Sequence, residues 1–174
     1  GKLTAAKARI EKIRTQLSDL DDYINNNLAF ADITLKSKDL LKGALKLTEG
    51  LAIEDINSIS SYEQYMVPAM IDYVKLLIEK LYPNGKLIEV TAENAQEVSD
   101  TLAEIQKYYE MIPEGERRYI SHYDEVMTLS EKAERFLSQN PVTGDSFAAG
   151  TCVTLMLLAG SAAALVVVKR RKRA

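Results

Sequence analysis

Residues 59–63 read Ile-Ser-Ser-Tyr-Glu, and residues 120–124 repeat that pattern as Ile-Ser-His-Tyr-Asp. Met66 and Met127 follow at the same offset of 61 residues. Each copy places a serine three residues before a carboxylate, which is the capping-box pattern that begins a helix. The repetition predicts an all-α fold built from two related helical modules.

The repeat extends upstream with an offset of 57 residues, since Asp-Ile-Thr at 32–34 corresponds to Glu-Val-Thr at 89–91. Thr34 and Thr91 stand where a helix N-cap is expected. The offsets of 57 and 61 residues give the approximate length of one module. A module of that length has a small core, so we expect the modules to stack and to share the helix at 61–82. The alternative is chance similarity between two helical segments.

Apolar spacing and chain breakers predict five helices in this region. In the first helix, Ile10, Ile13, Leu17, Leu20 and Ile24 recur at steps of three and four, as on one face of an amphipathic helix. The expected helices cover 3–28, a stretch from Thr34 to about Gly50, 61–81, 92–111 and 122–138.

Prolines and one short apolar run qualify that helix prediction. Pro68 belongs either in a first helical turn or at a kink. Pro-Asn-Gly at 83–85 and Pro113 are predicted to end helices. Residues 86–90 are a weak strand candidate, but they are isolated and predict no sheet.

The C-terminal segment has a different composition. Residues 147–168 contain only apolar residues, Gly, Ser and Thr, and residues 169–173 are all Lys or Arg. A helix over the 22 uncharged residues would span about 33 Å, enough to cross a hydrocarbon core of ~30 Å. Basic residues favour the cytoplasmic side, so we expect a transmembrane-type helix with the N-terminal region outside.

A short motif, Asn140-Pro141-Val142-Thr143-Gly144, precedes the apolar run. Motif, span and basic tail together resemble the sortase sorting signal of cell-wall-anchored surface proteins of Gram-positive bacteria (Firmicutes). The commonest form of that motif has Leu where this chain has Asn140, which leaves the class of sortase open. A plain single-pass anchor after a Pro-Gly linker is the alternative.

The resemblance implies an attachment chemistry. A sortase cysteine would attack the Thr143–Gly144 bond, and an amine of peptidoglycan or of a pilin would resolve the acyl-enzyme. Thr143 would then be the attached carboxyl end, and 147–168 would contact the membrane only transiently. Pro141 favours an extended backbone at Asn140, and Gly144 allows close approach to the cleaved bond.

Residues 74–136 resemble small helical repeats that occur in tandem before the wall anchors of Firmicute surface proteins. Val-Thr-Ala-Glu at 90–93 and the tyrosines at 108, 109, 119 and 123 carry this likeness. Residues before 74 match less well. The resemblance implies a stalk or spacer.

Charge and composition restrict the remaining functions. Residues 1–143 carry 17 Lys and Arg against 24 Asp and Glu, a net charge of −7, which argues against nucleic acid as a partner. The single cysteine, Cys152, lies in the apolar run, so the exported part offers no disulfide and no thiol site. The chain does not begin with Met, and we expect it to be the C-terminal part of a longer exported protein.

Candidate catalytic and metal-binding residues are few. His122 is the only histidine, and its counterpart in the first copy is Ser61, which favours a helix-start role. Asp19, Asp21 and Asp22 suggest calcium but lack the glycine and distal glutamate of a calcium loop. The charges at 114–118 form either a partner contact or a solvated turn, and we favour the turn.

These observations predict a non-catalytic, extracellular, wall-anchored stalk without metal or cofactor. Its predicted parts are module 1 at 1–73, module 2 at 74–138 and the sorting signal at 139–174. The alternative is an adhesin, in which an exposed helical face binds a host ligand, and an exposed apolar patch would favour it.

Overall fold

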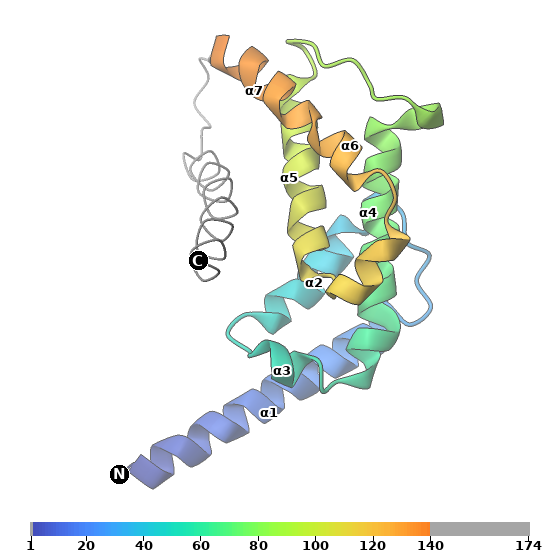
Figure 1. Cartoon of the computed structure of the whole chain (residues 1–174). Coiled ribbons are helices and arrows are strands. Elements are labelled where there is room, and N and C mark those ends of the chain that lie inside the picture. Colours follow the sequence, from blue (N-terminus) through green and yellow to red (C-terminus); the bar gives the residue numbers. More distant parts are fainter. Residues whose placement is uncertain (1, 140–174) are drawn as a thin grey trace, which may run out of the picture. The chain divides into compact units, whose positions relative to one another are not determined.

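The computed structural model describes residues 2–139, and these residues form seven α-helices with short 3₁₀ and π segments between them (Figure 1). The α-helices are α1 (Lys2–Asn27), α2 (Lys38–Thr48), α3 (Ile53–Ile56), α4 (Val67–Leu81), α5 (Ala95–Met111), α6 (Tyr123–Met127) and α7 (Leu129–Gln139). The short segments are η1 (Leu35–Ser37), η2 (Tyr62–Met66, a π turn), η3 (Pro83–Gly85) and η4 (Glu114–Tyr119). The predicted all-α class is confirmed for this part of the chain.

The α1 and α2 helices form an antiparallel pair. Leu20 and Ile24 of α1 are fully buried, as the predicted apolar face requires. The Tyr23 hydroxyl donates to the Leu40 carbonyl at 3.0 Å, and the Gln16 amide donates to the Glu49 carbonyl at 2.8 Å. Gly43 lies directly against the Tyr23 ring, where a Cβ would clash.

The helix predicted at 61–81 is present, with a π turn at its start. The Val67 N–H donates to the Tyr62 carbonyl, five residues back, and Pro68 follows in the first turn of α4. Proline has no N–H and collides with the carbonyl four residues before it, so a widened turn accommodates it. Nine of the 15 residues of α4 are buried, and α4 contacts α5, α6 and η1.

The last two predicted helices differ in their boundaries. α5 begins at Ala95 rather than at 92, because the Thr91 N–H donates to the Asn94 side chain at 2.8 Å and holds 91–94 in a turn. The predicted helix at 122–138 is divided into α6 and α7 at Thr128. Residues 86–90 form no strand, although the Ile88 N–H donates to the Leu81 carbonyl at 3.0 Å.

Not all of the predicted N-terminal caps are present. Thr34 caps η1: its hydroxyl accepts from the Lys36 N–H at 3.2 Å, and its own N–H donates to Ser37 at 3.0 Å. The capping boxes predicted at 60–63 and 121–124 were wrong. The helical segments after 61 and 122 have no side-chain cap.

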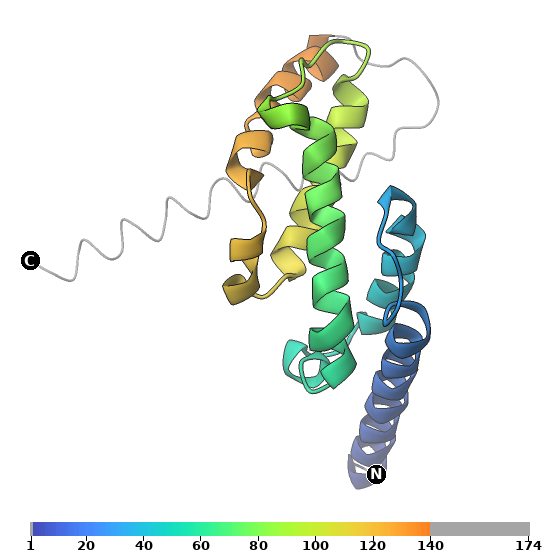
Figure 2. The ribbon, with the colours of Figure 1, turned by 90° about the vertical axis from the view of Figure 1, so that its right-hand side faces the viewer.

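The described residues share one hydrophobic core, which runs from Leu20 of α1 to Ala133 of α7. α4 and α5 lie side by side along it, and α6 and α7 lie against them (Figure 2). Within residues 2–139, no helix is both long and apolar enough to cross a membrane. The predicted transmembrane-type helix falls at 147–168, outside the described residues.

Candidate functional site

The predicted sortase-recognition residues lie outside the described part of the chain. They are Asn140, Pro141, Val142, Thr143 and Gly144, and the apolar run and basic tail follow them. The described residues end at Gln139, which is also the last residue of α7. No described side chain therefore bears on the attachment chemistry.

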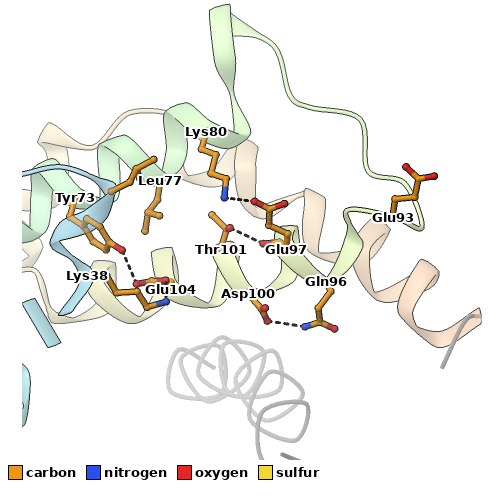
Figure 3. Close-up of a pocket in the computed structure, with 11 residues that line it drawn as sticks. Lys38, Tyr73, Leu77, Lys80, Glu93, Gln96, Glu97, Asp100, Thr101 and Glu104 are labelled. Carbon is orange, nitrogen blue, oxygen red and sulfur yellow. Dashed lines mark hydrogen bonds and ion pairs between the residues drawn. The ribbon is translucent and has the colours of Figure 1, made fainter. Parts of the chain in front are cut away.

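A groove with a volume of about 540 Å³ lies between η1, α4 and α5 (Figure 3). Its lining combines charged and polar side chains with two aliphatic residues, Leu35 and Leu77. The other lining residues are Lys38, Tyr73, Lys80, Glu93, Gln96, Glu97, Asp100, Thr101 and Glu104. Sequence reasoning did not single out any of them as functional.

Glu104 lies at the centre of the polar network in this groove. Its Oε2 accepts from Lys38 Nζ at 2.6 Å, and its Oε1 accepts from the Tyr73 hydroxyl at 2.9 Å. Tyr73 is 1% exposed and the Glu104 side chain 14%. One carboxylate on α5 thus joins the start of α2 to the middle of α4.

Burial keeps the tyrosines of this network neutral. Desolvation raises the pKa of Tyr73, and the hydrogen bond to Glu104 raises it further. Desolvation also raises the pKa of Tyr108 to about 12. The two rings meet edge to face with centroids 5.3 Å apart. Tyr73 therefore acts as a hydrogen-bond donor and is poorly suited to act as a base or nucleophile.

A second ion pair in the groove links α4 to α5. Lys80 Nζ of α4 lies 2.6 Å from Glu97 Oε1 of α5, and the hydrogen bond from Lys80 lowers the pKa of Glu97. Thr101 donates to the backbone carbonyl of Glu97 at 2.7 Å. Lys38 thus pairs with Glu104, and Lys80 pairs with Glu97. These ion pairs hold the helices around the groove together.

The residues considered for metal binding lie elsewhere. Asp21 accepts a hydrogen bond from the Ser61 hydroxyl, which ties α1 to the residue directly before η2 and α4. Asp19 and Asp22 are exposed. Across residues 2–139 there is no group of three His, Cys, Asp or Glu residues that could hold a metal ion.

His122 occupies the helix-start position predicted for it. It adopts a left-handed backbone, with φ of 63°, directly before α6. Its ring stacks on Tyr82 at a centroid distance of 4.5 Å, and its Nδ1 lies 3.3 Å from Glu125 Oε1. The side chain therefore connects the start of α6 to the end of α4.

Arg117 gives the charged turn at 114–118 a structural role. Its Nε donates to the Ile112 carbonyl and its Nη2 to the Glu110 carbonyl, both at 2.9 Å, so it binds carbonyls at the end of α5. Its guanidinium also lies 5.0 Å from the Tyr109 ring centroid. The neighbouring Arg118 is exposed and donates to the Tyr119 hydroxyl.

Comparison with models of known protein families, with curated proteins and with solved structures gave no match to this chain.

Proposed function

We propose that this chain is a non-catalytic spacer of a Gram-positive cell-surface protein, joined to the cell wall by sortase cleavage between Thr143 and Gly144. The observation that carries the proposal is the order of three features: the motif at 140–144, the uncharged run at 147–168 and the basic tail at 169–173. The uncharged run holds the motif near the membrane, where a membrane-bound enzyme meets it at a raised effective concentration.

The spacer is built, in this proposal, from two related modules that share the helix at 61–82. Two turns support the relation: the Thr34 N–H donates to Ser37 and the Thr91 N–H donates to Asn94, in each case three residues ahead. The following helix begins four residues after each threonine. The next matched positions, Leu41 with Val98 and Leu45 with Leu102, are all buried.

Rigid coupling between the modules suits a spacer. Lys38 belongs to the first proposed module, Glu104 to the second, and Tyr73 to the shared helix. The bond from Ser61 to Asp21 adds a further link from the shared helix to α1. These contacts tie α4 to α5, the start of α2 to α5, and the residue before η2 to α1, which would transmit orientation along the chain.

The adhesin hypothesis needs an apolar binding face, and we place it second. Six large apolar side chains are exposed in the described residues, and they come from five segments of the chain. They are Leu3 and Ile10 in α1, Phe30, Leu35, Ile53 and Tyr119. Leu3 and Ile10 share one face of α1, whereas each of the other four is exposed singly, which is ordinary on protein surfaces.

Cell fractionation tests the anchoring. The chain, carrying a secretion signal, is expressed in a sortase-competent Gram-positive host, and the wall and membrane fractions are compared. We expect the wild-type chain in the wall fraction, and the Thr143→Ala variant in the membrane fraction. Val142→Ala is the matched control because the family motif leaves that position variable, and it should behave as wild type. Wall attachment of Thr143→Ala would contradict the proposal.

A further inference from the structure

The apolar face of α1 has a spacing that the packing of the described residues only partly uses. Its members alternate at steps of three and four over the length of the helix: Leu3, Ala6, Ile10, Ile13, Leu17, Leu20 and Ile24. This is the 3.5-residue repeat of a coiled-coil seam, in which these residues take positions a and d.

The two halves of this seam have different surroundings. The C-terminal half is covered, since Leu20 and Ile24 are fully buried and α1 contacts α2 and η2. In the N-terminal half, Leu3 is 72% and Ile10 52% exposed. That half projects beyond the other described helices in both views (Figure 1, Figure 2).

The exposed half of the seam has basic flanks. Residues 2–16 carry five Lys and Arg and one acidic residue, although residues 1–143 are acidic. In the same register, Lys7 and Arg14 take position e and Arg9 position g, beside the apolar seam. The salt bridges among residues 2–139 engage none of these three.

We propose that the N-terminal half of α1 binds an acidic amphipathic helix of a partner protein. Apolar a and d residues of that helix would cover Leu3, Ala6 and Ile10. Its carboxylates at e and g would pair with Lys7, Arg9 and Arg14, because these flanking positions set partner choice in coiled coils. This inference goes beyond the spacer function and is independent of it.

The charges disfavour the two other occupants. A second copy in parallel would bring Arg9 opposite Arg14, and an antiparallel copy would also pair basic flanks, since both flanks are basic. An anionic membrane surface would suit the charge. However, interfacial helices commonly bury a face with Trp, Phe and Leu, whereas this seam is narrow and its members here are Leu3, Ala6 and Ile10.

A designed peptide provides the probe. It contains about four heptads with Leu and Ile at a and d and Glu at e and g, and its control has Lys in place of Glu. The full chain, carried in phosphatidylcholine nanodiscs, is titrated against each labelled peptide by fluorescence anisotropy. We expect the acidic peptide to bind at least roughly tenfold more tightly than the basic one.

Paired variants locate the binding on the seam. Arg9→Glu should weaken binding of the acidic peptide by roughly tenfold, whereas Lys12→Glu makes the same charge change away from the flanks and should change it little. Ile10→Ser should weaken it by a similar factor, and Ala8→Ser, on the outer face, should not. All four side chains are exposed in the free chain, so the fold is expected to survive each change.

Three results would overturn the proposal. One is equal binding of the acidic and basic peptides. Another is self-association of the chain, measured by analytical ultracentrifugation, at concentrations where the acidic peptide does not bind. The last is flotation of the nanodisc-held chain with phosphatidylglycerol vesicles while the acidic peptide stays unbound.

Discussion

At the scale of single residues, we expect the free energy of unfolding to depend on Glu104. Glu104→Ala should lower the free energy of unfolding by about 1–3 kcal/mol, because the buried Tyr73 hydroxyl loses its acceptor. Urea unfolding of the full chain, followed by circular dichroism, measures the change. Glu93→Ala is the control: Glu93 is exposed on the same groove, and its loss should stay within ~0.5 kcal/mol. Equal effects of the two substitutions would contradict the assigned role of Glu104.

The burial of Tyr108 should make the stability of the fold depend on pH. Burial raises its pKa from 10.0 to about 12, so between these values the folded state keeps a proton that the unfolded state has lost. The Tyr108 contribution is therefore fully present below pH 10 and falls as pH rises from 10 to about 12. Tyr108→Phe should reduce this decline in urea midpoint, while Tyr119→Phe, at an exposed site, should leave it intact. An unchanged decline in Tyr108→Phe would refute the prediction.

The end of α5 depends on Arg117 at the scale of secondary-structure elements. Arg117→Ala removes hydrogen bonds to the Glu110 and Ile112 carbonyls and the contact with Tyr109, so we expect a loss of about 1–3 kcal/mol in the free energy of unfolding. Hydrogen exchange of the amides at 108–112 should speed up with it. Arg118→Ala makes the same chemical change one residue later, where the side chain is exposed and donates to Tyr119, and should cost less than ~0.5 kcal/mol. The reverse order of effects would contradict this assignment.

Local sequence signals predicted the helical elements well, and for a physical reason. Apolar spacing placed α1, α2 and α5, and Pro-Asn-Gly at 83–85 ended α4 as expected, with Asn84 and Gly85 at positive φ. The capping boxes at 60–63 and 121–124 did not form, and the residue after each serine makes a tertiary contact instead: Ser61 donates to Asp21, and His122 stacks on Tyr82. No spacing rule relates partners that lie on different elements.

The groove could not be predicted for the same reason. Lys38 and Glu104 are 66 residues apart, and Tyr73 and Glu104 are 31 apart. Each looks like an ordinary residue of an amphipathic helix. Only the packing of both α5 and η1 on α4 brings the three together. The sorting motif is the opposite case, because its signal lies in contiguous sequence.

At the scale of the whole described region, one shared core predicts cooperative unfolding. Ile24 is fully buried in α1, so Ile24→Ala should cost about 2–5 kcal/mol. If α4 couples both proposed modules, hydrogen exchange in α5 should rise by the same factor as in α1. Ile10→Ala, at an exposed position of the same helix, is the control and should change neither. Two separate unfolding transitions, with only α1 and α2 affected, would show that the modules are independent.

Mass spectrometry of the mature C-terminus tests whether a sortase attaches the chain to the wall through Thr143. The chain is secreted by a sortase-competent Gram-positive host, released with wall-degrading enzymes and digested. We expect a C-terminal peptide that ends at Thr143 and is joined through an amide bond to a fragment of peptidoglycan or to a pilin lysine. A membrane-bound chain that keeps its C-terminal tail through Ala174 would contradict it.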